Sequence, residues 1–266
     1  MTQQRAHVVR RGSGMPVVFV QGNGVDHRLL LDLDDVFEAD GRFERFHLDL
    51  PGFGQTSPLD GLGGLPEIAD WLDEVIGEQV GSRPFLLVAC SLGGLLAREV
   101  VRRRSDQCAG FAILAPVVDS VRENRRVPEH VVLEEEPGLL ATIPPEHVEL
   151  FAPLAVIRTR ATWERFASAA LPGLLAADAE AMERLDQRYS LEELPDEAID
   201  GYDRPVLIVA GRQDAVVGWQ DQVELARRFP RATVAVLDRT GHNTHLERPA
   251  LVRALLTDWL TAIEAG

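Results

Sequence analysis

Short continuous runs of apolar residues alternate along this chain with longer segments in which apolar residues recur at helical spacing. Continuous runs are typical of strands that are covered on both faces, and hence of a mainly parallel sheet. The runs that we interpret as strands are residues 7–10, 17–20, 46–50, 85–89, 111–115, 206–210 and 233–237. The segments that we interpret as helices between them are residues 65–80, 92–104, 219–229 and 249–263. This alternation predicts an α/β fold with a doubly wound, mainly parallel sheet.

One connection is much longer than a parallel crossover requires. Residues 116–205 separate the fifth run from the sixth, whereas a crossover between parallel strands needs only about a dozen residues. We therefore expect an insertion before the last two strands. Helical spacing inside it predicts helices at residues 145–160, 162–170 and 179–189. The chain accordingly divides into a first part of the core at residues 1–118, a helical insertion at 119–200 and a second part of the core at 201–266.

A single serine lies in a sharp turn between the run at 85–89 and the helix at 92–104. A nucleophile at the tip of such a turn is held in a strained backbone conformation and needs small residues two positions away on either side. Ser91 has Ala89 and Gly93 at these positions, whereas Cys90 has bulky residues at the same spacing. We therefore favour Ser91 over Cys90 as nucleophile, although a thiol is intrinsically the better one. For this fragment alone, a strand that simply ends in a Ser-Gly turn remains an alternative.

A carboxylate and an imidazole follow two later strands. Asp214 comes shortly after the run at 206–210, and His242 shortly after the run at 233–237. A serine hydroxyl is a poor nucleophile at neutral pH, so a base must remove its proton during attack. His242 would be that base, and Asp214 would fix the imidazole tautomer and stabilise the imidazolium.

The order Ser91, Asp214, His242 resembles that of the α/β-hydrolase family, and the likeness extends over nearly the whole chain. Residues 21–24 read QGNG, where the family usually has His-Gly, and residues 49–56 read DLPGFGQT, similar to the family's Asp-x-Pro-Gly-x-Gly-x-Ser. Residues 241–249 carry Gly-His followed by Glu-x-Pro, a further hallmark of the family.

The resemblance implies roles for the insertion and for further residues. The insertion at 119–200 would form a helical cap over the active site. The backbone N–H groups of Asn23 and Leu92 would form the oxyanion hole. Asp119 occupies a position where some members of the family carry the acid, so it stays open as an alternative to Asp214.

Serine at position 91 also restricts the reaction. Family members that displace halide or open epoxides use a carboxylate there, so Ser91 implies acyl chemistry through an acyl-enzyme. We expect a serine esterase-like hydrolase of a small, largely apolar carboxylic ester, lactone or thioester.

The alternatives are a carbon–carbon bond hydrolase, an acyl-transfer or cyclisation enzyme, an aminopeptidase and a non-catalytic ligand-binding homologue. Asn243 weakens the first alternative, because Trp commonly follows the histidine in those enzymes. Glu134–Glu136 would suit an aminopeptidase, but a solvated charge run is the simpler interpretation.

Other histidines have weaker claims to a role. His245 lies three residues after His242, yet no acidic or sulfur cluster accompanies the pair, so we expect a structural role and no metal ion. His27 follows the expected oxyanion loop and would either line the pocket or lie at the surface. His130 and His147 lie in the insertion, and nothing marks them as catalytic.

Composition restricts the partners and the setting. The chain has 27 basic residues, all of them arginine, and 42 acidic ones, and its net charge of −15 repels nucleic acid. A hydrophobic content of 45% is enough for a sizeable core. The chain shows neither the apolar stretch of a signal peptide nor that of a membrane span, so we expect a cytoplasmic protein away from membranes. We expect Cys90 and Cys108 to be free thiols, the substrate to be a small molecule, and no cofactor to be needed. The oligomeric state does not follow from the sequence.

Overall fold

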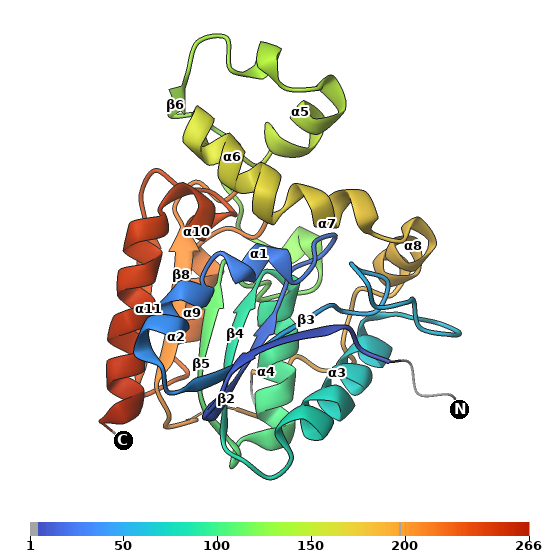
Figure 1. Ribbon diagram of the computed structural model, residues 1–266, viewed down its shortest axis with the longest axis vertical. Helices are drawn as coiled ribbons and strands as arrows, with labels where there is room; N and C mark the ends of the chain where they lie inside the picture. The colour runs from blue at the N-terminus through green and yellow to red at the C-terminus, as the bar shows by residue number, and fades with distance from the viewer. Residues whose placement is uncertain (1–4, 197, 200, 266) are drawn as a thin grey trace.

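A seven-stranded sheet runs through the centre of the protein (Figure 1). The structure is a computed structural model and describes residues 5–196, 198–199 and 201–265. The strand order is β1-β3-β2-β4-β5-β8-β9, in which β1 pairs antiparallel with β3 and the other pairs are parallel. The strands are β1 (Val8–Gly12), β2 (Met15–Val20), β3 (Phe43–Leu48), β4 (Phe85–Cys90), β5 (Cys108–Leu114), β8 (Val206–Gly211) and β9 (Ala232–Leu237). The predicted mainly parallel α/β sheet is confirmed.

Helices cover both faces of this sheet (Figure 1). One face is packed by α3 (Leu65–Val80), α4 (Leu92–Arg104) and α9 (Gln220–Ala226). The other is packed by α1 (Arg28–Leu31), α2 (Asp34–Asp40), α10 (Thr244–Glu247) and α11 (Pro249–Glu264). Successive residues of a strand enter the two apolar cores in turn, as Val17 and Val18 do on β2. Burial on both faces therefore explains why the inner strands β2, β4, β5 and β8 are continuous apolar runs.

The predicted helices agree with the long observed ones, and the short helices were missed. The bounds of α3 and α4 match the prediction, α11 ends one residue later, and α9 is shorter than residues 219–229. The helices α1, α2 and α10 were not predicted because four to seven residues are too few to show a helical period.

Strand β3 begins at Phe43, three residues before the predicted start at 46. The first residues of β3 were not predicted as strand, because they include Glu44 and Arg45 and charged residues are rarely buried in a strand. Both are nevertheless buried and paired. Glu44 accepts from Arg83 at 2.7 Å, and the Arg45 Nε donates to Asp34 at 2.9 Å. Charge pairing thus allows polar residues inside an otherwise apolar strand.

The chain between β5 and β8 forms the expected insertion, which we call the insertion from here on. Figure 1 shows α6 and α7 lying across one end of the sheet, with β6 and α5 beyond them. Its elements are η1 (Arg122–Asn124), β6 (Glu134–Glu135), η2 (Leu140–Thr142), α5 (Pro145–Phe151), β7 (Ile157–Arg158), α6 (Arg160–Ala169), α7 (Leu171–Ala176) and α8 (Ala179–Gln187).

Two predictions inside the insertion need correction. The helix predicted at 145–160 ends at Phe151, because Pro153 follows and the chain then turns to pair β7 with β6. The segment α7 was not predicted. The boundaries proposed at residues 1, 200 and 266 lie outside the described residues, and the division at 118 and 119 stays a prediction.

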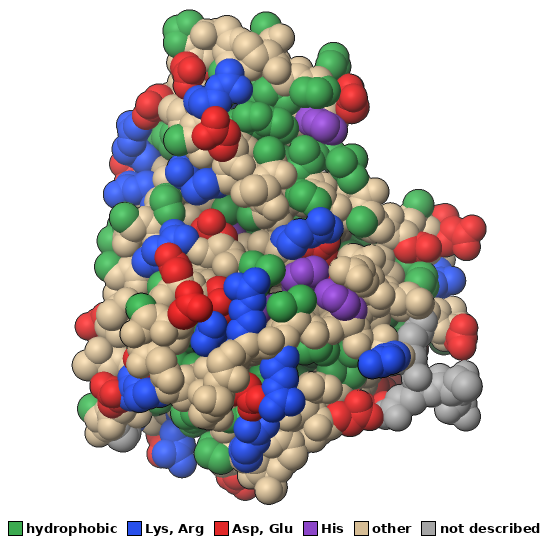
Figure 2. All heavy atoms as spheres, in the orientation of Figure 1, with side chains coloured by type: hydrophobic (Ala, Val, Ile, Leu, Met, Phe, Trp, Pro, Cys, Tyr) green, Lys and Arg blue, Asp and Glu red, His purple; other side chains and the backbone are tan. Residues whose placement is uncertain are grey.

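Acidic and basic side chains alternate over the face shown in Figure 2, and hydrophobic ones gather toward its upper end, where α5 lies in Figure 1. Arginines commonly bridge neighbouring elements: Arg253 of α11 contacts Asp35 of α2 at 3.0 Å. Arginines thus pair locally with part of the acidic charge, and the net charge of −15 remains. None of the helices that the structure describes combines the length and the apolarity of a membrane span.

One buried arginine joins helix α4 to both ends of the insertion. The Arg98 Nη2 donates to the carbonyl oxygens of Val117 at 2.7 Å and Val118 at 2.8 Å, where the insertion begins. The Arg98 Nη1 forms an ion pair with Asp196, where it ends. The Arg98 side chain is fully buried, so these partners replace the hydration of its two terminal nitrogens.

Removing this guanidinium is expected to destabilise the protein strongly. Arg98→Ala leaves Asp196 and two carbonyls without their donor, and we expect the free energy of unfolding to fall by about 3–5 kcal/mol. The control is Arg204→Ala, because Arg204 is exposed and lies 3.6 Å from Asp203. Its expected cost is at most about 1 kcal/mol. Urea unfolding of both variants measures the difference, and equal losses would refute this role of Arg98.

Candidate active site

Ser91 stands in a strained turn between β4 and α4. Its backbone has φ 54° and ψ −120°, a conformation that L-residues rarely adopt and that costs on the order of 1–3 kcal/mol. Its N–H donates to the Leu114 carbonyl at 3.0 Å, and its carbonyl accepts from Gly94 and Val117, each at 2.9 Å. The backbone on both sides of the turn is thus fixed by neighbouring segments.

Two glycines let other backbone approach this turn. A Cβ on Gly93 would lie 2.2 Å from the Val20 carbonyl oxygen, and one on Gly22 would lie 3.0 Å from the Ser91 Cβ. The distance at Gly93 is too short for any larger residue, and the contact at Gly22 is tight. The small residue predicted at Gly93 is therefore required by contact with the end of β2.

His242 and Asp214 form a hydrogen-bonded pair. The His242 Nδ1 lies 3.0 Å from the Asp214 Oδ2, on the loops that follow β9 and β8. Asp214 is fully buried, and its Oδ1 accepts the backbone N–H groups of Val216 at 2.8 Å and Val217 at 3.1 Å. With Nδ1 donating to this carboxylate, Nε2 is the nitrogen of His242 that can accept a proton.

A small cavity of about 60 Å³ is lined by both Ser91 and His242. Its apolar walls come from the loop before α1, from α1 and from the insertion, namely Val25, Leu29, Leu154, Phe166, Ala170 and Leu174. Gly22, Asn23, Cys90 and Asn243 complete it, and no arginine or carboxylate lines it among the described residues. The cavity thus joins a hydroxyl and an imidazole to an uncharged, apolar space.

The two residues proposed for the oxyanion hole lie beside Ser91. Asn23 lines the cavity, and Leu92 is the first residue of α4. The loop that carries Asn23 is tied to β3 through Gln21, which stands where the family usually has histidine. In the amide orientation that satisfies both groups, the Gln21 NH₂ donates to the Leu48 carbonyl at 2.8 Å. Its amide oxygen accepts the Leu50 N–H at 2.7 Å. Glutamine can supply both a donor and an acceptor here, so it anchors the loop to β3.

The rival residues are placed differently. The carboxylate of Asp119 accepts from the Val121 N–H and from the Asn124 Nδ2, each at 2.8 Å, and its described partners do not include His242. Cys90 is buried and unpaired, and burial raises the pKa of its thiol to about 12. Its thiolate is therefore scarce at neutral pH. Cys108 is also free and buried, and burial raises its pKa to about 11.

The glutamates at 134–136 do not form a free acidic site. Glu134 pairs with Arg239, Glu135 lies 2.8 Å from Arg158, and the Glu136 carboxylate accepts the Arg160 N–H at 2.8 Å. All three glutamates are exposed, as expected for a solvated charge run, and each carboxylate also has a partner within the protein.

The remaining histidines lie outside the cavity. His245 is fully buried, and its Nε2 lies 3.1 Å from the Leu29 carbonyl oxygen. His130 lies 3.3 Å from the Ala155 carbonyl, and the ring of His147 stacks on that of Trp163 with 6.3 Å between centroids. These contacts are structural.

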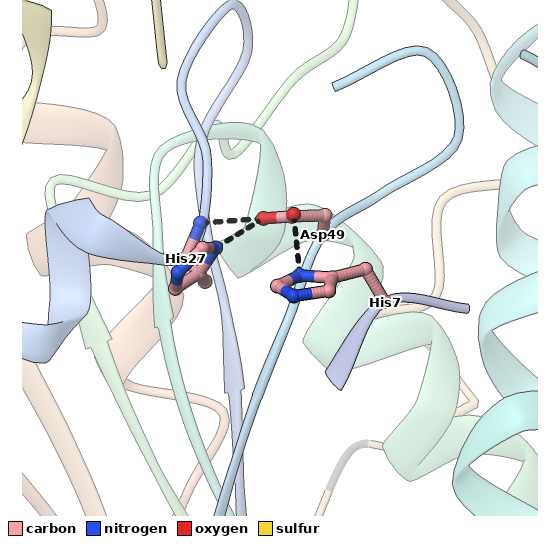
Figure 3. A group of neighbouring side chains, drawn as sticks. All are labelled: His7, His27 and Asp49. Atoms are coloured by element: carbon pink, nitrogen blue, oxygen red, sulfur yellow. Dashed lines mark hydrogen bonds and ion pairs between the residues drawn. The ribbon is translucent and has the colours of Figure 1, made fainter. Parts of the chain in front are cut away.

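His27 belongs to a cluster that the sequence did not reveal. Figure 3 shows the His7 and His27 rings on either side of the Asp49 carboxylate, each Nδ1 at 2.8 Å from one of its oxygens. The three ligand atoms lie within 4.8 Å of one another, so the group has the composition of a metal site. Each Asp49 oxygen also accepts a backbone N–H, from His27 at 2.8 Å and from Gln55 at 2.9 Å. The Asp49 carboxylate therefore has four hydrogen-bond donors within the protein. The expectation that His27 lines the pocket or the surface is wrong, because its ring is buried against Asp49.

Comparison with known proteins decides the family. A family model described as the α/β hydrolase fold matches residues 15–249. The chain belongs to the α/β-hydrolase family. Pimeloyl-[acyl-carrier protein] methyl ester esterase of Shewanella woodyi is 24% identical to this α/β-hydrolase over 96% of the chain and 97% of its own length. (E)-2-((N-methylformamido)methylene)succinate hydrolase of Acinetobacter baylyi is also 24% identical, over 96% of the chain and 94% of its own length.

A solved structure agrees with this α/β-hydrolase closely. An alpha/beta superfamily hydrolase from Oenococcus oeni PSU-1 superimposes with a TM-score of 0.88 at 28% identity, covering 97% of this chain and 96% of the other. The family resemblance expected from the residues around Ser91, Asp214 and His242 is therefore confirmed.

The burial of His245 predicts a pH-dependent stability. Burial lowers the pKa of His245 from 6.5 to about 4, so the folded protein disfavours its protonated form. The stability that this neutral histidine contributes is present above pH 6.5 and is lost as the pH falls toward 4. Between pH 7 and pH 5 the loss amounts to about 2 kcal/mol.

His245→Gln keeps a donor near the Leu29 carbonyl but does not titrate. Urea unfolding at pH 7 and pH 5 is expected to show a smaller acid-induced loss of stability in this variant, by about 2 kcal/mol. The same pH dependence in both proteins would show that His245 is not the group responsible.

Proposed function

We propose that this α/β-hydrolase is a serine hydrolase that cleaves a small, largely apolar carboxylic ester, lactone or thioester through an acyl-enzyme. The observation that carries the proposal is the arrangement around one cavity. Ser91, in its strained turn, and His242, bonded to Asp214, line the same apolar space.

The chemistry follows from these groups. The Ser91 Oγ attacks the acyl carbon while the His242 Nε2 takes its proton, and Asp214 stabilises the imidazolium. The imidazolium then protonates the leaving alcohol or thiol, which departs and leaves the acyl group on Ser91. A water molecule attacks this ester, again with His242 as base, and releases the acid. In both steps the backbone N–H groups of Leu92 and Asn23 would hold the negative oxygen.

The lining of the cavity supports a small uncharged acyl group. Phe166, Ala170 and Leu174 of the insertion form an apolar wall, so the insertion would act as a cap over the substrate. A charged acyl chain would find no opposite charge there among the described residues. The named activity of the Shewanella woodyi relative, a methyl ester esterase, supports carboxylic ester chemistry as the reaction class. The net charge of −15 supports a small-molecule substrate over nucleic acid.

Ser91 is expected to react with an alkyl fluorophosphonate. Labelling followed by peptide mass spectrometry is expected to place the phosphonate on Ser91, to fail in Ser91→Ala and to persist in Cys90→Ala, which removes the thiol and keeps the Ser91 hydroxyl. Hydrolysis of p-nitrophenyl butyrate is expected to follow the same pattern. Labelling of Cys90, or full activity in Ser91→Ala, would overturn the choice of nucleophile.

Asp214 is expected to matter for turnover and Asp119 to matter little. Asp214→Asn removes the acceptor that fixes the His242 tautomer, and kcat should fall by a factor of about 10³–10⁴. Asp119→Asn keeps the shape of the side chain, and its kcat should stay within about threefold of the unmodified protein, because the hydrogen bonds of Asp119 to described residues stay within its own loop. Steady-state kinetics on p-nitrophenyl butyrate measures both variants. The reverse ranking would make Asp119 the acid.

A further inference from the structure

Glu247 holds two separate segments with one carboxylate. Its Oε1 accepts the backbone N–H groups of Val156 at 2.6 Å and Ile157 at 2.9 Å. Its Oε2 accepts the Gly241 N–H at 2.6 Å and the Thr240 hydroxyl at 3.0 Å. Glu247 is only 7% exposed, so these four donors replace water around a buried anion.

The two segments are those that matter at the cavity. Thr240 and Gly241 directly precede His242 in the chain. Val156 and Ile157 belong to the insertion and follow Leu154, which lines the cavity. A single side chain therefore connects the backbone that carries the proposed base to the backbone that carries part of the apolar wall.

Direct contact reinforces this connection. A Cβ on Gly241 would lie 2.9 Å from the Val156 Cγ2 and 3.1 Å from the Leu154 carbonyl oxygen. The loop of His242 thus touches the insertion with no space for a side chain between them. If the insertion moved away at this point, Glu247 would lose two of its donors.

Glutamine cannot replace this carboxylate. Burial raises the pKa of Glu247, and the four donors act against that shift by favouring the anion. An amide at the same place has one oxygen and one NH₂ group. Turned either way, the NH₂ group faces a backbone N–H, which produces repulsion where the carboxylate has a hydrogen bond.

We propose that Glu247 is a positioning residue. By joining the loop of His242 to the insertion, it holds His242 beside Ser91. This proposal rests on the proposed function, in which His242 is the base. The base and the apolar wall are then held together as one unit. Loss of the hydrogen bonds to the Glu247 carboxylate slows turnover more than it weakens substrate binding.

The test compares Glu247→Gln with a matched control, Asp196→Asn. Asp196 is also a buried carboxylate of the insertion, but its partner is Arg98 on α4. Both variants lose a charge that anchors the insertion, and only Glu247→Gln disturbs the loop of His242. Active Ser91 is first titrated with an alkyl fluorophosphonate, and kcat and KM for p-nitrophenyl butyrate are then expressed per titrated serine.

The expected results separate positioning from stability. In Glu247→Gln, kcat per titrated serine falls about 10- to 100-fold and KM changes less than threefold. In Asp196→Asn, Tm falls while kcat per titrated serine stays within threefold of the unmodified protein. A Glu247→Gln protein with lowered Tm and unchanged kcat per titrated serine would reduce Glu247 to a purely structural role. Should Glu247→Gln not fold, Thr240→Val removes one of the four donors and is expected to lower kcat two- to fivefold, and an unchanged kcat would overturn the proposal.

A second readout does not depend on turnover. The His242 Nδ1–H proton, shared with Asp214, is followed by proton NMR and assigned by its absence in His242→Ala. We expect a resolved signal in the unmodified protein and in Asp196→Asn, and a broadened or missing one in Glu247→Gln. A protein without esterase activity contradicts the proposed function, whereas an unchanged NMR signal in Glu247→Gln contradicts the positioning role.

Discussion

The backbone of Ser91 is held in a conformation that it would not adopt alone, and the arrangement of the site depends on this constraint. Hydrogen bonds to Leu114, Gly94 and Val117 fix the turn, and the contact between Gly93 and the end of β2 sets the start of α4. Such strain persists only where the surrounding structure over-determines it. The sheet and α4 thus provide the rigid support that directs one hydroxyl into a cavity, and substitutions that loosen this packing act on the site without touching it.

The other half of the site comes from loops rather than from regular elements. Asp214 is fixed by two backbone N–H groups of its own loop, and His242 is fixed by Asp214 through Nδ1. Glu247 then links the loop of His242 to the insertion. Two buried carboxylates, Asp214 and Glu247, each have several donors, and they give these loops a definite geometry because a buried anion that loses a partner destabilises the fold.

The main strands and the candidate residues Ser91, Asp214 and His242 could be predicted, because the sequence patterns that mark them are local. The strand–serine–helix pattern around Ser91 depends on small neighbours two residues away, and the order of Asp214 and His242 depends on the strands before them. What could not be predicted depends on contacts between residues far apart in the sequence. The start of β3 was hidden because Glu44 and Arg45 find charged partners elsewhere. No sequence pattern predicts the hydrogen bonds that join His7, Asp49 and His27. The same holds for the hydrogen bond from the Val156 N–H to Glu247, although Glu247 belongs to a motif that marks the family.

The most direct measurement is a crystal structure of the protein after reaction with a small alkyl fluorophosphonate, whose tetrahedral phosphorus imitates the intermediate. The account predicts phosphorus bonded to the Ser91 Oγ, with the phosphoryl oxygen within about 3 Å of the Leu92 and Asn23 nitrogens and the alkyl group against Phe166. The His242 Nε2 is expected within hydrogen-bonding distance of the Ser91 Oγ. An adduct on another residue, or one on Ser91 whose oxygen faces neither N–H group, would contradict it.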